Sequence, residues 1–306
     1  MKYRYMGKSG LKVSRVCLGT MTFGQEHWGC DKKTSVNIVD KFLDYGGNFI
    51  DTADMYGKGL SEEFIGDAIK GKRDNIVLAT KCFFAMIDSP TSKGLSRKHI
   101  FEACEASLRR LKTDYIDLYQ THGPDHKTPT EETMNALNDL IGQGKVRYIG
   151  CSNFQAWQIV KANSYCSQFG LERYISAQHL YNMILRDVER EILPAIEDQG
   201  MGFICWSPLA SGMLTGKYER TEKPQEGSRM DHRASMDLPR YWHDNGFKIV
   251  EAVQEEAKKF GKTPAQIALS WLLFNRIITA VIIGLRTIEQ LDDLIQVGDW
   301  NLPEDA

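Results

Sequence analysis

The sequence lacks the features that mark membrane-spanning, disulfide-stabilised and metal-binding proteins. No segment approaches the roughly 18 apolar residues that a membrane helix needs. The first ten residues, MKYRYMGKSG, carry basic residues without a following apolar run, so no export signal is expected. The seven cysteines are odd in number, scattered and never spaced as CxxC, which favours reduced thiols and no metal site. We therefore expect a cytoplasmic protein.

Neither sign of charge is in excess. The chain of 306 residues carries 38 Lys and Arg against 40 Asp and Glu, a formal net charge of -2. This balance gives no electrostatic basis for binding nucleic acid or a membrane surface. A hydrophobic fraction of 42% argues against disorder, and no linker composition interrupts the chain, so we expect a single domain over residues 1–306.

A dinucleotide-binding fingerprint of the Rossmann type is also missing. Such a sheet carries GxGxxG directly after its first strand, whereas this sequence reads CLGTMTFGQ over residues 17–25. Any nucleotide site must therefore be built in another way.

The sequence does contain a regular alternation of short, β-rich apolar segments with longer segments of helical period, which is typical of repeated βα units. The predicted strands are 15–18, 48–51, 76–80, 115–120, 146–151, 175–178, 202–205 and 280–283. The predicted helices are 34–45, capped by Thr34, then 61–71, opened by Ser61, and 97–111, 130–141, 153–169, 187–198, 246–260, 264–274 and 287–296. Eight such units indicate a (β/α)8 TIM barrel, with a doubly wound sheet as the alternative.

Two segments fall outside this alternation. Residues 1–14 are predicted to form a β-hairpin with a GKSG turn that covers the bottom of the barrel. Residues 219–245 are rich in Pro, Gly, Arg and Asp and show no clear period. Long insertions of this kind are usually functional, so we interpret this one as a long loop over the site at the C-terminal face.

Polar residues of unusual kinds follow three neighbouring strands. FIDTADMY places Asp51 and Tyr56 after the second strand, VLATK places Lys81 after the third, and DLYQTH places His122 after the fourth. Active sites of such barrels lie at the carboxyl ends of the strands. A lysine or a histidine alone is typical of an ordinary surface, but four such residues at adjacent strand ends favour a catalytic site.

These four side chains suit proton donation to a carbonyl oxygen while a hydride reaches its carbon. A free tyrosine titrates at about pH 10, so an acidic Tyr56 needs a neighbouring positive charge, which Lys81 is placed to supply. We expect Asp51 to hold and compensate that ammonium group. We expect His122 to orient or polarise the carbonyl oxygen.

With these residues the chain resembles the aldo-keto reductases, whose catalytic tetrad is Asp, Tyr, Lys and His on a (β/α)8 barrel. The resemblance covers nearly the whole chain. It is carried by Lys81, by His122 and by GGNFIDTADMYG (46–57), YIGCSNF (148–154), AQHLYN (177–182), WSPLASGMLTGKY (206–218) and IIGLRTIEQLDD (282–293). It is nearest to the branch of broad-range bacterial reductases and potassium-channel beta subunits. It implies an NADP-dependent carbonyl reductase of the alcohol dehydrogenase type.

The resemblance also implies where the cofactor binds. Ser152, Asn153 and Gln178 are expected to hold the nicotinamide carboxamide, and Trp206 to stack on the ring. Each has a structural alternative: Ser152 and Asn153 as caps of the next helix, Gln178 as a buried polar residue of the barrel, and Trp206 as core. The further expected cofactor contacts are Gly19, Thr20, Met21, Asp51, Ser207, Pro208, Leu209, Ser211, Gly212, Lys217, Arg229, Gly284, Arg286, Thr287, Gln290 and Asp293.

Arg286 decides the expected choice of cofactor. A guanidinium fork suits the 2′-phosphate of NADP and has no comparable target on the ribose of NAD. Arg229 is expected either to assist or to be a solvated loop charge. Where many relatives have Glu-Asn after the glutamine of this segment, the chain has Asp292 and Asp293, which puts an adenine contact in doubt.

The expected substrate is a small carbonyl compound, aromatic or of medium size and apolar, because Trp28, Met55, Phe83 and Phe84 are expected to line the pocket. Two alternatives remain open. One is a cofactor-binding barrel that regulates a partner, as in the channel beta subunits, although the sequence shows nothing like an inactivation extension. The other is an aldolase that uses Lys81 as a Schiff base, which requires a lysine of lowered pKa. The oligomeric state is left open.

Overall fold

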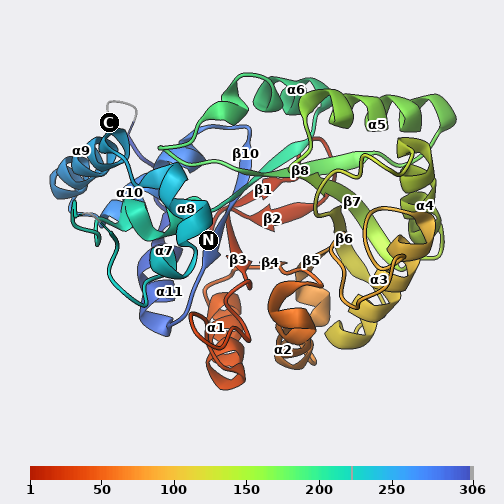
Figure 1. Cartoon of the computed structure of the whole chain (residues 1–306), viewed down its shortest axis with the longest axis horizontal. Coiled ribbons are helices and arrows are strands. Elements are labelled where there is room, and N and C mark those ends of the chain that lie inside the picture. The colour runs from red at the N-terminus through yellow and green to blue at the C-terminus, as the bar shows by residue number, and fades with distance from the viewer. Residues whose placement is uncertain (222, 304–306) are drawn as a thin grey trace.

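The structure, a computed structural model, describes residues 1–221 and 223–303. Its strands in these ranges are β1 (Tyr3–Tyr5), β2 (Lys12–Ser14), β3 (Val16–Gly19), β4 (Phe49–Asp51), β5 (Val77–Cys82), β6 (Ile116–Thr121), β7 (Val146–Ser152), β8 (Tyr174–Leu180), β9 (Gly202–Trp206) and β10 (Ile278–Gly284). β1 and β2 form an antiparallel hairpin. The other eight strands are parallel and close into a barrel in the order β10-β3-β4-β5-β6-β7-β8-β9 (Figure 1). The TIM barrel is confirmed, and the doubly wound sheet is excluded.

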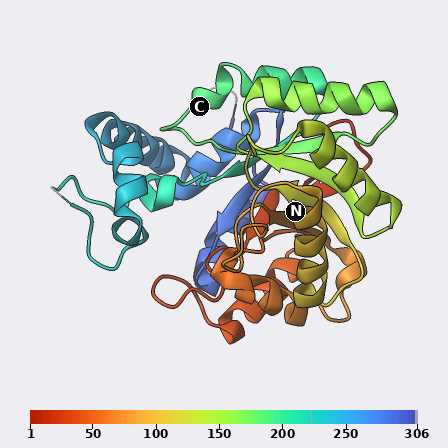
Figure 2. The same cartoon turned by 45° about the vertical axis from the view of Figure 1, so that its right-hand side comes forward.

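Helices surround this barrel (Figure 2). They are α1 (Lys32–Asp44), α2 (Leu60–Ala68), α3 (Arg97–Leu111), α4 (Thr130–Gly142), α5 (Ala156–Phe169), α6 (Ile192–Gln199), α7 (Arg229–His232), α8 (Ala234–Tyr241), α9 (Asp244–Phe260), α10 (Pro264–Phe274) and α11 (Ile288–Leu294). Neighbouring helices pack in chain order around the ring, as repeated βα units require.

Several predicted helix starts are wrong. Thr34 does not cap α1, because the side chain of Asp31 accepts the bond from the Thr34 amide. α2 begins at Leu60 after Gly59, whose φ of 95° only glycine adopts easily, and the hydroxyl of Ser61 is used elsewhere. α5 begins at Ala156 with Gln155 as its cap, so the segment from residue 153 is not helical at its start.

The hairpin seals the N-terminal end of the barrel, as predicted. Met6, Leu11 and Val13 are buried in one cluster with the inward-facing side chains of the barrel. A Cβ atom on Gly202, the first residue of β9, would lie 2.5 Å from the sulfur of Met6. The guanidinium of Arg4 donates to carbonyls at the end of α10, which ties the hairpin to the helix ring.

The barrel interior changes from apolar to polar along the strands. Its apolar layer contains Phe49, Ala79, Leu118 and Ile204, one from each of β4, β5, β6 and β9. Side chains alternate in a strand, so the next inward-facing positions are two residues further on. These positions are occupied by Asp51, Lys81, Gln120 and Trp206. The same alternation that fills the core therefore delivers the polar residues to the C-terminal end of the barrel.

The segment 219–245, predicted to be a long loop without helices, contains α7 and α8, and α9 begins at Asp244 instead of residue 246. Met230 and Tyr241 of this segment are buried with Tyr218 and Phe247 in a second apolar cluster, packed against α9 and α10. Figure 2 shows the segment projecting beside these helices. Neither α7 nor α8 is long enough to show a helical period. The apolar residues of the segment are therefore irregularly spaced in the sequence.

Candidate active site

A buried ion pair lies at the centre of the site. The Nζ atom of Lys81, at the end of β5, lies 2.5 Å from Oδ2 of Asp51, at the end of β4, and donates to the carbonyl of Thr52 at 2.8 Å. Both charged side chains are buried. Burial alone lowers the pKa of Lys81, but the pair with Asp51 and the contact with Tyr56 outweigh it, so the pKa is raised. The ammonium group is therefore held charged.

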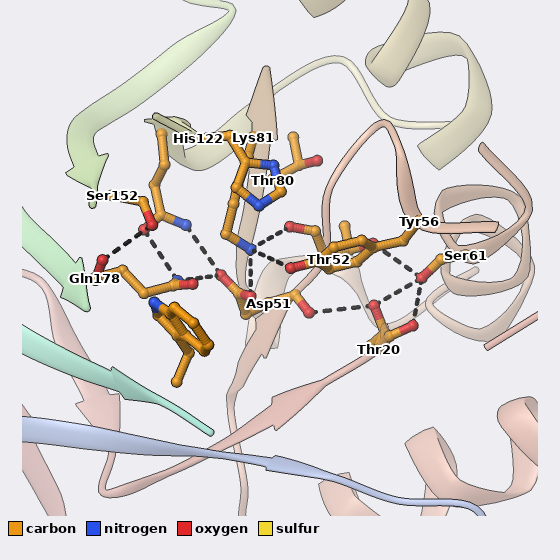
Figure 3. A network of polar contacts seen from close by, with 12 residues as sticks. Thr20, Asp51, Thr52, Tyr56, Ser61, Thr80, Lys81, His122, Ser152 and Gln178 are labelled. Carbon is orange, nitrogen blue, oxygen red and sulfur yellow. Dashed lines mark hydrogen bonds and ion pairs between the residues drawn. The ribbon is translucent and has the colours of Figure 1, made fainter. Parts of the chain in front are cut away.

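Tyr56 lies directly over this pair (Figure 3). Its hydroxyl oxygen lies 3.4 Å from Nζ of Lys81. Gly57 follows with φ 57° and begins the turn that leads the chain into α2. Burial raises the pKa of Tyr56, and Lys81 opposes that shift. Lys81 therefore lowers the pKa of Tyr56, as expected, but burial raises it by more.

His122 completes the group of four. Its ring lies edge-to-face with Tyr56, with the ring centres 5.7 Å apart, and its Nδ1 atom is buried without a hydrogen-bond partner among the described residues. Burial lowers the pKa of His122 well below its usual value, and the charge of Lys81 lowers it further. The imidazole is therefore neutral at physiological pH, so it contributes a hydrogen-bonding group beside the phenol but no charge.

Two glutamines hold the other oxygen of Asp51. Gln178 donates to Oδ1 at 2.8 Å and Gln120 donates to the same atom at 3.0 Å. Gln178 also donates to the side-chain oxygen of Gln120 at 3.2 Å, so both of its N–H groups are used and only its carbonyl oxygen is left to accept. Sequence reasoning missed Gln120. Its position two residues after Leu118, an inward-facing residue of β6, is the signal that identifies it.

A hydroxyl cluster supports the back of the site, as Figure 3 shows. Ser61 lies 2.8 Å from the hydroxyl of Thr20 and 3.0 Å from that of Thr52, and it donates to the carbonyl of Thr20. The amide and hydroxyl of Thr20 both contact the carbonyl oxygen of Asp51. The hydroxyl of Thr20, predicted to contact cofactor, thus braces the ends of β3 and β4 together with Ser61.

The residues expected at the nicotinamide form one chain of hydrogen bonds. Ser152 donates to the backbone oxygen of Gln178 at 2.9 Å and accepts from Asn153 at 3.0 Å. The indole of Trp206 donates to Asn153 at 3.1 Å. Asn153 has φ 62°, a conformation that a non-glycine residue adopts at some cost. Because Gln155 caps α5, the alternative that Ser152 and Asn153 cap this helix is wrong.

The segment after β9 turns through several left-handed residues. Ser207, Ala210 and Ser211 have φ values of 52°, 49° and 55°, and Gly212 follows at 91°. Strained backbone of this kind gathers at binding sites, and turns that bring successive amides together suit anions. The predicted contacts Pro208 and Leu209 lie within the same turn. The hydroxyl of Ser211 donates to buried Asp237 of α8 at 2.5 Å, which fastens the insertion to this turn.

Three cationic residues gather beside that turn. Burial lowers the pKa of Lys217, and the charges of Arg286 and Arg229 lower it further, which places the three groups within electrostatic reach of one another. The Cζ atom of Arg229 lies 5.7 Å from the centre of the Trp28 ring. Its Nη1 atom would lie 3.6 Å from a Cβ atom on Gly284. Its Nε atom is buried without a partner among the described residues. Such a cluster is suited to bind phosphate groups.

The other expected cofactor contacts have these surroundings. The side-chain oxygen of Gln290 accepts from the amide of Arg286 at 2.8 Å, and Thr287 caps α11. Asp293 accepts from Gln266 at 2.9 Å and so links α11 to α10. Gly19 packs closely against β10, where a Cβ atom would lie 2.3 Å from a methyl group of Ile282, and half-buried Met21 follows in the next loop.

Aromatic side chains surround the mouth of the site. Phe84 lies edge-to-face with His122 and with Phe83, with ring centres 5.1 Å apart in both pairs. Met55, next to Tyr56, is 38% exposed. Of the four residues predicted to line a substrate pocket, Phe84 contacts His122, Met55 precedes Tyr56 in the chain and Phe83 packs against Phe84, whereas Trp28 lies under the guanidinium of Arg229.

Within residues 1–221 and 223–303, no group of three or more His, Cys, Asp and Glu residues is arranged to hold a metal ion. The same residues include no helix that is long and apolar enough to cross a membrane. The seven cysteines are free thiols, and six of them are buried.

The arrangement can be compared with known proteins. Residues 15–306 match the Aldo/keto reductase family. An uncharacterized oxidoreductase of Bacillus subtilis, YrpG, is 40% identical over all of this chain and 93% of its own length. A probable voltage-gated potassium channel subunit beta of Arabidopsis thaliana is 38% identical over 98% of this chain and 92% of its own. A versiconal hemiacetal acetate reductase of Aspergillus parasiticus is 36% identical over 96% and 92%. The chain belongs to the Aldo/keto reductase family and is an oxidoreductase of that family.

Proposed function

We propose that this protein is an NADPH-dependent oxidoreductase that reduces aldehydes or ketones to alcohols, with Tyr56 as general acid. The observation that carries the proposal is the hydroxyl of Tyr56 at 3.4 Å from a buried, charged Lys81 that Asp51 compensates. The family of the chain supports the reaction class, because aldo-keto reductases generally use nicotinamide cofactors.

Each residue of the tetrad has a distinct role in this reaction. A nicotinamide held by Ser152, Asn153, Gln178 and Trp206 would supply the hydride for the carbonyl carbon. As the electron pair of the carbonyl bond moves to the oxygen, Tyr56 donates its phenolic proton there, and the alcohol is complete. Lys81 stabilises the phenolate that remains, Asp51 fixes Lys81, and neutral His122 orients the carbonyl oxygen through a hydrogen bond.

The polar groups of the site fit the cofactor. Gln178 has only an acceptor free, which suits the N–H group of a carboxamide, and Trp206 offers a ring face held by Asn153. Lys217, Arg229 and Arg286 form a cationic cluster that suits phosphates. We assign the 2′-phosphate to Arg286, which makes NADPH the preferred cofactor.

Two other functions have weaker support. A Schiff-base aldolase requires a lysine that is readily deprotonated, whereas the surroundings of Lys81 raise its pKa. A regulatory role beside a channel rests on the likeness to relatives with that name. The intact tetrad favours the reductase. The scattered free thiols favour a reducing compartment, for which we propose the cytoplasm.

The proposal is tested with a panel of aromatic, medium-sized aliphatic and small polar carbonyls, in which consumption of NADPH and of NADH is followed by absorbance. We expect turnover with NADPH and a preference for aromatic or apolar compounds, because Phe83, Phe84 and Met55 flank the tetrad. Borohydride trapping with the same compounds serves as the aldolase control. Absence of turnover across the panel, or trapping of Lys81 as an adduct, would contradict the proposal.

A further inference from the structure

Asp54 is a buried carboxylate that the proposed mechanism does not use. It lies between Asp51 and Tyr56 in the chain and is fully buried. Its Oδ1 atom accepts from the amide of Met55 at 2.6 Å, and its own amide donates to the carbonyl of Lys81 at 3.2 Å. Its Oδ2 atom is buried without a hydrogen-bond partner among the described residues. A carboxylate oxygen left in this condition strongly favours the protonated form.

A second buried carboxylate, Glu62 of α2, lies within electrostatic reach of Asp54. Glu62 is paired with Arg110 of α3 at 2.7 Å and accepts from the hydroxyl of Thr80 at 2.6 Å. Both of its oxygens are therefore occupied, and Arg110 compensates its charge. The titratable and charged groups that face Asp54 are Glu62, Arg110, Lys81, Tyr56, Cys82 and Tyr119.

These surroundings give Asp54 an unusual titration. Burial, and then the charge of Glu62, raise the pKa of Asp54 to about 7, against the weaker opposing effects of the hydrogen bond from the Met55 amide and of the charges of Arg110 and Lys81. The group therefore changes its charge in the physiological range. Burial is the main cause that raises the pKa of Tyr56, the charge of Asp51 raises it further, and ionised Asp54 makes a smaller addition in the same direction. The buried oxygen without a partner and the adjacent carboxylate give this behaviour a geometric cause.

We propose that Asp54 is a positioning residue whose buried charge controls the proton transfer at Tyr56 and makes carbonyl reduction fall as the pH rises through neutrality. This inference rests on the proposed function. When Asp54 is protonated it carries no charge, so it does not oppose the lowering of the Tyr56 pKa by Lys81. When Asp54 is ionised, Tyr56 holds its proton more strongly and donates it less readily. The loop that presents the acid thus also contains the group that adjusts it.

Asp54→Asn tests the charge without removing the acceptor for the Met55 amide. The parent kcat for reduction, with both substrates saturating, is expected to fall about threefold or more between about pH 6 and about pH 8.5. In Asp54→Asn this fall is expected to disappear, with the KM for NADPH unchanged. Asp54→Ala should show the same flat profile at a lower kcat, because it also loses the acceptor. Glu63→Gln, an exposed neighbour on α2, is the matched control and should keep the parent profile.

Thermal unfolding tests the titration of Asp54 without any activity. The folded state holds this proton up to a higher pH than the unfolded state, so the ionisable side chain lowers stability as the pH rises between the two pKa values. Asp54→Asn should therefore raise the Tm little at about pH 4.5 and clearly at about pH 8. The effect of Glu63→Gln on the Tm should not increase with pH.

The outcomes separate this inference from the proposed function. If the increase in Tm caused by Asp54→Asn does not grow with pH, the inference is overturned, whatever the enzyme activity shows. A growing gain with an unchanged kinetic profile would also overturn it, because Asp54 would then titrate without controlling Tyr56. If the parent reduces no carbonyl with either cofactor, the proposed function fails, and the role of Asp54 in proton transfer fails with it. A growing Tm gain would then still show that the buried carboxyl titrates near neutrality.

Discussion

In the proposed reaction, the ion pair of Lys81 and Asp51 serves function more than stability. Removing two charges from water costs several kcal/mol, and their attraction repays this only when hydrogen bonds occupy the remaining atoms. Here Gln120 and Gln178 hold one oxygen of Asp51, and the carbonyl of Thr52 accepts from Lys81. The extra partners fix the geometry of the pair. This precision is what a tyrosine acid requires, because the ammonium must stay beside the phenol.

Arg286 is the residue on which the choice of cofactor is predicted to depend. Arg286→Ala should weaken the binding of NADPH by about one to two decades, since a charged hydrogen bond contributes about 1.5 to 3 kcal/mol. Binding of NADH should change little, because NADH has no 2′-phosphate. Titration of both cofactors by quenching of tryptophan fluorescence measures the ratio.

Equal weakening of both cofactors, or of neither, would show that Arg286 does not discriminate between them. Lys217→Ala and Arg229→Ala are the comparison variants, since these two residues form the cationic cluster with Arg286. If Arg286 does not discriminate, we expect one of these two variants to weaken NADPH more than NADH, because Lys217 and Arg229 are the other cations of the cluster.

Single residues were predictable where the alternation of a strand places them in the barrel interior and their chemical type is unusual for that position. Asp51, Lys81 and His122 follow apolar strands and are unusual there, so they were identified. Gln120 was missed because an amide in a strand carries no strong chemical signal, although it faces the same interior. Asp54 was missed because it follows the end of β4, where no alternation applies, and because the charged groups that act on it include Arg110 of α3, which is distant in the sequence.

At the scale of elements, the insertion that contains α7 and α8 is joined to the turn after β9 by one buried carboxylate. Asp237 accepts from Ser211 at 2.5 Å and from Arg233 at 3.0 Å. The turn and the insertion therefore hold one another in place beside the cationic cluster. The sequence placed this segment near the site but could not reveal its helices, because α7 has only four residues and α8 contains Pro239.

Asp237→Ala is predicted to raise the dissociation constant for NADPH by about tenfold, because the turn loses its anchor and Ser211 its acceptor. The rate of the chemical step should change much less, since the tetrad belongs to other strands. Stopped-flow measurement of cofactor binding and of single turnover separates the two effects.

Ser211→Ala is the partner variant for this prediction. If the hydrogen bond is what matters, the double variant should bind NADPH about as well as Asp237→Ala alone. Fully additive losses would show that Asp237 acts through Arg233 or through packing and not through the turn.

At the scale of the whole molecule, stability and chemistry lie at opposite ends of the barrel. The hairpin and the apolar layer fill the N-terminal end, and the polar network fills the C-terminal end, as is usual for this fold. The barrel was predictable from eight repeated units, whose order restricts the topology strongly. Exact element ends were less predictable because caps such as Asp31 and Gln155 depend on local geometry.

Met6→Ala is predicted to lower the free energy of unfolding by about 2 to 5 kcal/mol, because it leaves a cavity under the barrel. Met6 is fully buried in the cluster that closes this end. The affinity for NADPH at low temperature should stay near that of the parent. Denaturant unfolding and cofactor titration measure the two quantities, and a loss of affinity in the folded variant would contradict the separation of the two ends.

The central claim is that Tyr56 donates the proton to the carbonyl oxygen, and Tyr56→Phe tests it most directly. The measurement is the single-turnover rate of NADPH oxidation with a carbonyl that the parent reduces, made on enzyme whose cofactor affinity is determined in parallel. We expect a fall of about a hundredfold or more in the rate, with NADPH binding nearly unchanged, because the phenol acts only in the transition state. A rate within a few-fold of the parent would contradict the account.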